Sequence, residues 1–189
     1  MRRAIRNLAA LGATIFVCYG LQQTKPRYSD LTGPIAVNGV VDEAVDGRTF
    51  SIKLDRLTLA NNVSRSRFGK LSVYSTSGVW IIIEATLAAT TSTTVISEAV
   101  LKGPTGLEYR QSRRLGPGSK MAPHRAEPGL PKSVLFFFEV PRNQVRGSTL
   151  LVSENRVPRL DAQVRIGLEP LLADPTQGPT PILDAYRLP

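Results

Sequence analysis

Cysteine, histidine and aromatic residues are scarce in this chain, and each shortage excludes a class of protein. Its 189 residues include one cysteine, Cys18, one histidine, His124, and only 6% aromatic residues. A lone cysteine excludes an intrachain disulfide, and zinc sites built from several cysteines and histidines are excluded as well. A Ser-His-Asp triad could use only His124, which we expect on a surface loop because it lies between Pro123 and Arg125. We therefore expect no metal, no cofactor and no catalytic residue.

Acidic residues are missing from the first 28 positions, where five bases lie. The whole chain has 24 Lys plus Arg and 15 Asp plus Glu, a formal net charge of +9. More than half of this excess therefore belongs to the N-terminal segment. The charge is weak evidence for a domain that binds polyanions.

An uncharged apolar run over residues 8–21 follows three arginines, which is the pattern of an export signal. As a helix it covers about 21 Å of a hydrocarbon core that is about 30 Å thick, so it can span if Arg6 extends to the headgroups. Cleavage and lipidation motifs around Cys18 are poor, so we expect an uncleaved anchor over residues 1–22; cleavage near Leu21 is the alternative. The early arginines predict a cytoplasmic N-terminus. We predict a single-pass protein of the inner or plasma membrane with an extracytoplasmic C-terminal domain.

Short β-type runs separated by turn residues follow a linker over residues 23–34. The phase of the apolar residues reverses inside the second run, which predicts a β-bulge near Asp55 and Arg56. The pattern indicates an all-β fold, an antiparallel β-sandwich of seven to eight strands over residues 35–168. The predicted runs are residues 35–41, 48–60, 79–89, 95–102, 107–110, 132–140, 148–153 and 162–168.

Two segments lack the pattern of regular strands. Residues 111–131 are rich in glycine and proline and should form a long exposed loop. Residues 169–189 hold five prolines among apolar residues and should form an extended tail that packs on the domain.

Three segments in order carry a family resemblance: the apolar strand of residues 78–86, the turn of residues 103–106 that leads to Tyr109, and the strand that ends at Val140 and Pro141. They resemble a bacterial immunoglobulin-like family of unknown function that is often mislabelled as telomeric-repeat-binding-factor-like. A Gly-Pro-Thr-Gly turn stands where that family usually has an acidic one. The resemblance implies a secreted or membrane-tethered immunoglobulin-like sandwich that works as a binding or accessory module. It transfers no catalytic residue.

Two of the predicted strands, residues 79–89 and 132–140, are apolar on both faces. If their other apolar residues point inward, then four large side chains point outward. One face of an antiparallel sheet normally meets water, so something must cover them. Either the proline-rich tail covers them or they bind an envelope or membrane protein. The candidate partner-binding residues are Trp80, Ile82, Leu135 and Phe137.

The loop region of residues 102–132 has seven bases and two acids. It could bind an anionic polymer of the envelope or lipid headgroups through screened attraction. Nucleic acid is disfavoured because the chain is exported and the loop has few aromatic residues for stacking. The candidate anion-binding residues are Arg110, Arg113, Arg114, Lys120 and Arg125.

The predicted function is a non-catalytic, membrane-anchored, extracytoplasmic interaction or accessory module of the cell envelope. Two alternatives stay open. Glu84 and Glu139 fall late in the two apolar strands and could form the paired acid site of a hydrolase that acts on an envelope polymer. The second alternative is a periplasmic module that binds an anionic ligand through the basic loop.

Overall fold

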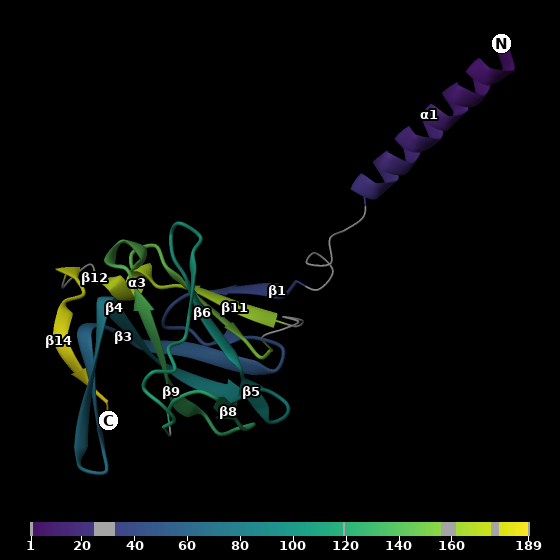
Figure 1. Cartoon of the computed structure of the whole chain (residues 1–189). Helices are drawn as coiled ribbons and strands as arrows, with labels where there is room; N and C mark the ends of the chain where they lie inside the picture. The colour runs from purple at the N-terminus through teal and green to yellow at the C-terminus, as the bar shows by residue number, and fades with distance from the viewer. Residues whose placement is uncertain (1, 25–32, 119, 156–161, 175–177, 189) are drawn as a thin grey trace. The chain divides into compact units, whose positions relative to one another are not determined.

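A computed structural model describes residues 2–24, 33–118, 120–155, 162–174 and 178–188 (Figure 1). The chain divides into two compact units, Met1–Gly33 and Pro34–Pro189. The first unit contains helix α1, Arg2–Gln23. Among the described residues, no helix is long and apolar enough to cross a membrane. The expected helix is therefore present, whereas its expected membrane span has no support in the structure.

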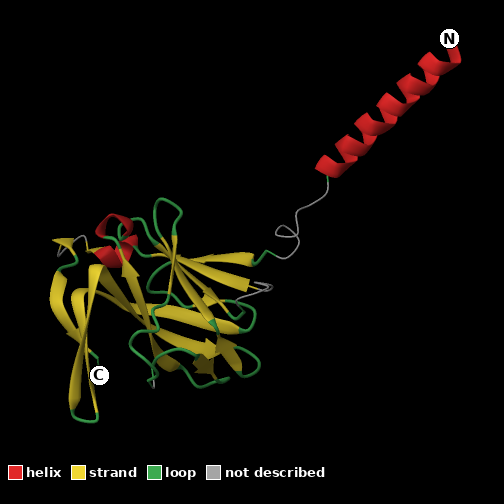
Figure 2. Ribbon diagram, in the orientation of Figure 1, coloured by secondary structure: helices red, strands yellow, loops and turns green. Residues whose placement is uncertain are grey.

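The second unit is a β-sandwich, as predicted (Figure 2). Pairing within its two main sheets is antiparallel except for β1 with β11 and β14 with β3, which are parallel. One sheet has the order β1 (Ile35–Gly39), β11 (Ala162–Gly167), β10 (Thr149–Ser153), β6 (Glu98–Lys102) and β7 (Glu108–Arg110). The other has the order β14 (Ile182–Arg187), β3 (Phe50–Arg67), β4 (Lys70–Ala89) and β9 (Lys132–Val140), with β2 (Val45–Asp46) also on β3.

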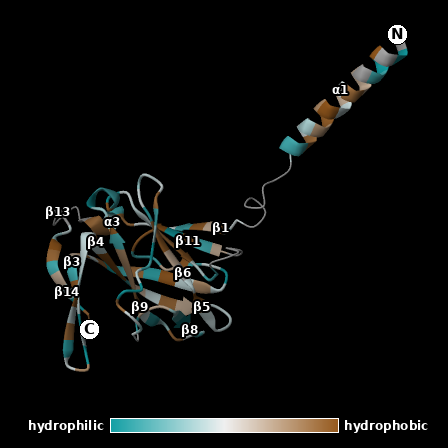
Figure 3. Cartoon of the chain, in the orientation of Figure 1, coloured by the Kyte–Doolittle hydropathy of each residue, from teal (hydrophilic) through white to brown (hydrophobic). Residues whose placement is uncertain are grey.

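The two sheets share one core of inward-facing side chains. Ile81 and Phe136 face it from one sheet, and Leu150 and Val164 face it from the other, all of them fully buried. Each large side chain of this kind contributes about 1.5–3 kcal/mol when it is buried. Figure 3 shows hydrophobic and hydrophilic residues side by side on the strands of the sandwich, whereas residues 134–138 of β9 are apolar without interruption.

The predicted bulge in β3 is confirmed by a register shift between Leu54 and Arg56. It returns Leu57 to the core that Leu54 faces, although the two are three residues apart. A second shift, between Ala60 and Asn62, was not predicted. Beyond it β3 and β4 continue as a hairpin, which β14 flanks as far as Ser64 and which is two-stranded only after that residue. The predicted strands stopped at residue 60 and began at residue 79.

The segments predicted to be irregular contain several short elements. The loop of residues 111–131 includes β8, which pairs with β5, and the predicted tail ends in β14, which pairs in parallel with β3. The tail is therefore part of the sandwich rather than a segment laid on it. The predicted run of residues 95–102 is wrong as a single strand, because it divides into β5 (Thr94–Ile96) and β6, which lie in different sheets. The other additional elements are β8 (His124–Ala126), a 3-10 turn (Arg142–Gln144), α3 (Glu169–Leu172), β12 (Ala173–Asp174) and β13 (Gly178–Pro179).

Candidate functional site

The four residues selected as a partner-binding patch do lie together on the outer face of β4 and β9. The register sets Ile82 opposite Phe137. None of the four, Trp80 and Leu135 included, is more than 2% exposed. The prediction that these residues form an exposed binding patch is therefore wrong, because their side chains are buried in the folded chain.

A second apolar cluster on the outer face buries these side chains. Leu115 and Met121 cover them from the segment before β8, and Tyr186 and Leu188 cover them from the C-terminal strand region. The ring of Tyr186 meets that of Phe137 edge-on at 6.5 Å between centroids. Of the two alternatives, the cover is intramolecular, but the tail supplies only part of it.

The rest of the cover comes from a segment that we call the strap, residues 111–121, all described except residue 119. The Ser112 amide donates a hydrogen bond to the Phe137 carbonyl at 2.7 Å, and the Leu135 amide donates to the Lys120 carbonyl at 2.7 Å. These bonds satisfy backbone groups on the edge of β9 that does not face β4. One segment thus protects an open sheet edge and covers an apolar face.

Two ion pairs hold the strap against the sheet. Arg114 Nη1 lies 2.5 Å from Glu139 Oε2, and the same guanidinium lies 5.8 Å from the centre of the Trp80 ring. Lys120 Nζ lies 3.5 Å from Glu84 Oε1. All four groups are partly exposed, so each pair contributes about 0.2–1 kcal/mol at most. Two of the predicted anion-binding bases, Arg114 and Lys120, are thus paired with the two candidate catalytic carboxylates.

Glu84 and Glu139, the candidate hydrolase pair, are well separated along the sheet. Glu139 stands opposite Trp80 in the register, four positions along β4 from Glu84. At the rise of a β-strand this separates the two backbone positions by about 13 Å. The carboxyl groups of glycosidases lie about 5–9.5 Å apart. The backbone positions of Glu84 and Glu139 are thus farther apart than the carboxyl groups of such a pair, and each carboxylate contacts a base.

The five predicted anion-binding bases do not form one site. Arg125 Nε lies 2.7 Å from Glu127 Oε1, and Arg110 is exposed on β7. Arg113 is exposed on the strap, and its guanidinium has no ion pair or hydrogen bond with any described residue. Because Arg114 and Lys120 are paired as well, Arg113 is the base of the strap that is available to a ligand.

Arg113 lines a pocket of about 460 Å³ between the strap and the sandwich. Its walls are mostly apolar with a few polar groups, a composition typical of sites for small molecules. The sequence did not indicate this pocket because it joins Ser97 to residues of the strap and the turn after it. The lining residues are Ser97, Gln111, Ser112, Arg113, Gly116, Pro117, Met121, Ala122 and Pro123.

His124 was expected on the surface, but it is 2% exposed. Its ring packs edge-on against Phe136 at 4.7 Å between centroids, and its Nε2 lies 3.4 Å from Gln111 Nε2. Burial, and secondarily the charge of Lys132, lower the pKa of His124 from 6.5 to about 4. His124 is therefore neutral at neutral pH and supports Gln111 at the pocket wall.

Acidification should destabilise the protein through His124. Between pH 6.5 and about 4 the unfolded chain binds a proton at this histidine that the folded chain does not. The free energy of unfolding is therefore unaffected by this histidine above pH 6.5, and it falls by about 3 kcal/mol as the pH is lowered from 6.5 to about 4. Urea denaturation of the protein and of His124→Gln across this range measures the loss. Identical pH slopes in the two proteins would contradict it.

Shortening Leu115 should loosen the strap. Leu115 is 1% exposed above the outer face, so Leu115→Ala is expected to cost about 2–5 kcal/mol of unfolding free energy. The single tryptophan, Trp80, lies in the same cluster and should shift its emission to longer wavelength if water enters. Leu107→Ala, at a side chain that is 57% exposed, is the matched control and should change stability by less than about 0.5 kcal/mol. Equal effects of the two variants would show that the strap does not seal the face.

Comparison with known proteins gives likeness in shape only. No protein-family model matches the chain, and no curated protein does. Similar solved structures include an uncharacterized beta-sandwich protein from Clostridium difficile, with 14% identity and a TM-score of 0.46, covering 76% of this chain and 99% of that chain. The yjhA protein from Bacillus subtilis has 11% identity and a TM-score of 0.48, covering 67% and 97%. MPT63, a secreted protein from Mycobacterium tuberculosis, has 14% identity and a TM-score of 0.49, covering 70% and 98%. Likeness at this level does not identify a family, so the resemblance to the immunoglobulin-like family stays a prediction beyond the sandwich itself.

Proposed function

We propose that the protein is an exported, non-catalytic binding module of the cell envelope and that its binding site is the pocket beside the strap. The observation that carries the proposal is Arg113, which lines this pocket and whose guanidinium has no ion pair or hydrogen bond with any described residue. A ligand with an apolar body and an anionic group matches the chemistry of the site. The body would contact Met121 and Pro117, and the anion would accept charge-assisted hydrogen bonds from Arg113.

The arrangement of the acidic groups supports binding over hydrolysis. Glu84 and Glu139 each face a base and are separated by the row of apolar side chains that the strap covers. His124 is buried and neutral beneath the pocket wall, where its contacts are Phe136 and Gln111. These groups hold the site in shape, which is the role that a binding module needs from them.

The N-terminal unit supports export. Three arginines precede the apolar run of helix α1, and the sandwich begins only after the linker. This order is that of a chain directed across the cytoplasmic membrane with its C-terminal domain outside. The pocket would then meet envelope components rather than cytoplasmic ones.

Fractionation of the native host tests the export. The sandwich should be found outside the cytoplasm, and it should be degraded by protease added to spheroplasts. Intact mass then separates two forms: the full chain in the membrane fraction indicates a retained anchor, and a chain that begins near Leu21 indicates cleavage. Recovery of protease-resistant protein in the cytosol would contradict the export.

Binding of 1-anilinonaphthalene-8-sulfonate tests the pocket, since this probe joins apolar rings to a sulfonate. Its fluorescence should rise saturably with the purified protein. Arg113→Gln should weaken the affinity roughly tenfold because a charge-assisted hydrogen bond is lost. Arg110→Gln removes the same charge from β7 outside the pocket and should leave the affinity unchanged. Equal weakening by both variants would mean that the probe responds to net charge and not to this site.

A further inference from the structure

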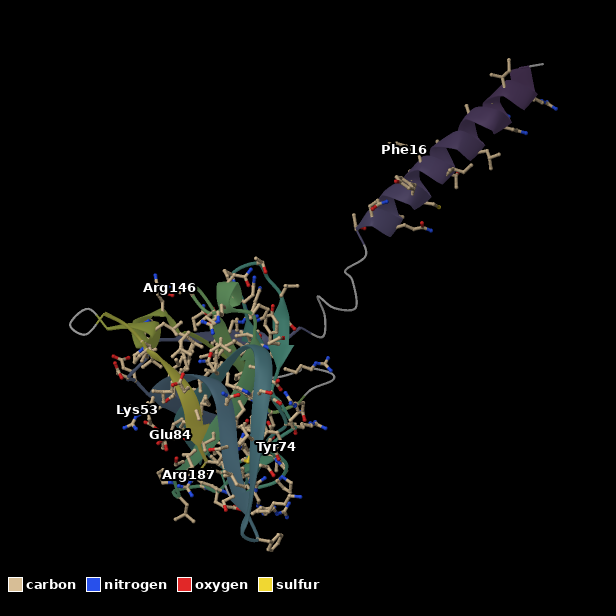
Figure 4. All side chains as sticks on the ribbon, turned by 60° about the vertical axis from the view of Figure 1, so that its left-hand side comes forward. Phe16, Lys53, Tyr74, Glu84, Arg146 and Arg187 are labelled. Atoms are coloured by element: carbon tan, nitrogen blue, oxygen red, sulfur yellow. The ribbon has the colours of Figure 1, made fainter. Side chains whose placement is uncertain are left out.

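The hairpin of β3 and β4 extends beyond the other strands. Its ladder runs from Asn62 opposite Ser75 to Arg67 opposite Lys70. The neighbouring strand β14 ends its pairing with β3 at Ser64, and no described strand pairs with the hairpin beyond that point. Figure 4 labels Tyr74 and Arg187 near the base of the hairpin, which continues past both.

The tip of the hairpin carries a large aromatic side chain, Phe68, that is not buried in the folded protein. Phe68 is 94% exposed, more than any other large hydrophobic residue that the structure describes. It also holds a left-handed backbone, with φ of 51°, and Gly69 follows with φ of 75°. Two-residue turns of this kind favour asparagine or aspartate before glycine, and a large aromatic residue is disfavoured there. Phe68 therefore gains neither burial nor a preferred conformation in the protein alone.

The sides of the hairpin differ in character. Leu71 and Val73, 58% and 60% exposed, stand opposite Ser66 and Ser64 on one face. On the other face Arg67 stands opposite Lys70, and the Arg67 guanidinium lies 5.3 Å from the centre of the Phe68 ring. Residues 61–78 contain no acid. The tip is thus an aromatic ring flanked by exposed bases.

We propose that this tip inserts into the surface of a bilayer that contains anionic lipids. Phe68 would enter the boundary between headgroups and acyl chains, while Arg67 and Lys70 remain at the lipid phosphates. The charge complementarity favours anionic over zwitterionic lipid. The pairing of the two strands satisfies backbone groups close to the tip, which limits the desolvation penalty of shallow insertion.

A bilayer fits this surface better than a protein partner does. Stable protein interfaces bury about 800 Å² on each side with closely matching shapes. A two-residue tip on a narrow ribbon offers little of that area. A bilayer needs no matching shape, since an apolar tip and adjacent bases are sufficient for binding. The inference depends on the proposed function only in that the sandwich must be exported to meet the membrane surface. It does not depend on ligand binding in the pocket beside the strap.

The test is Phe68→Trp in the full chain, mixed with vesicles of phosphatidylcholine with or without phosphatidylglycerol. Trp80 is buried, so subtracting the emission of the unmodified protein leaves the signal of the new tryptophan. With phosphatidylglycerol present, its emission should shift to shorter wavelength and be quenched by lipids brominated in the upper acyl chain. Lipid binding by helix α1 alone would not produce this local signal. High salt should weaken the response.

Two further variants make the outcome specific. Leu107→Trp places a tryptophan at an exposed turn and should not be quenched. Adding Arg67→Gln and Lys70→Gln to Phe68→Trp should lower the affinity for anionic vesicles on the order of tenfold or more. The inference is overturned if the tryptophan at position 68 stays in water on vesicles that have bound the protein, or if position 107 responds equally. It is also overturned if the emission of the tryptophan at position 68 shifts to shorter wavelength only when a membrane protein is added to the vesicles. Purified protein is used, so failure of export or of the pocket would leave this result unaffected.

Discussion

The structure depends on covering a sheet that is apolar on both faces. Where β4 and β9 pair, the inner row of side chains fills the sandwich core and the outer row includes Trp80 and Phe137. Leaving four large residues of the outer row in water would forgo an amount of free energy comparable to the stability of a typical domain. A second layer is therefore obligatory. The chain builds it from two remote segments, the strap and the strand region that ends at Leu188.

The need for this cover explains why bases that were predicted to bind an external anion instead form ion pairs within the protein. A strap with little regular structure must be held in one position over the apolar row, and its bases meet carboxylates at two points along that row, Glu139 and Glu84. Arg65 of β3 adds a third contact, since its guanidinium donates to the carbonyls of Leu115 and Pro117. Arg113 is outside this set of contacts. It is left on the wall of the pocket that forms where the strap bends back toward β8.

The sequence predicted what local periodicity can encode and missed what depends on contacts between distant segments. The change in the phase of the apolar residues after Leu54 predicted the bulge in β3. The uninterrupted run of residues 132–140 predicted β9 with its bounds. The need for a cover was also predictable, because both faces of two strands are apolar. Which segment supplies the cover was not, since glycine and proline in residues 111–121 hide the inward-facing Leu115 and Met121 among loop residues. His124 was misplaced for the same reason: its burial comes from Phe136 and Gln111, which are not its neighbours in sequence.

Strand β3 connects the outer cluster to the projecting hairpin. Along the last part of β3, Val63 enters the outer cluster, Arg65 holds the strap, and Phe68 follows at the tip. The strand that contributes Val63 to the outer cluster is therefore also the strand that leads to the exposed aromatic ring. In the proposed docking, the entropic cost would come mainly from ordering one side chain, because the ladder up to Arg67 and Lys70 already pairs the backbone on both sides of the turn. The burial of Val63 and the exposure of Phe68 thus occur within the same part of the chain, because both follow from the register that continues past Asn62.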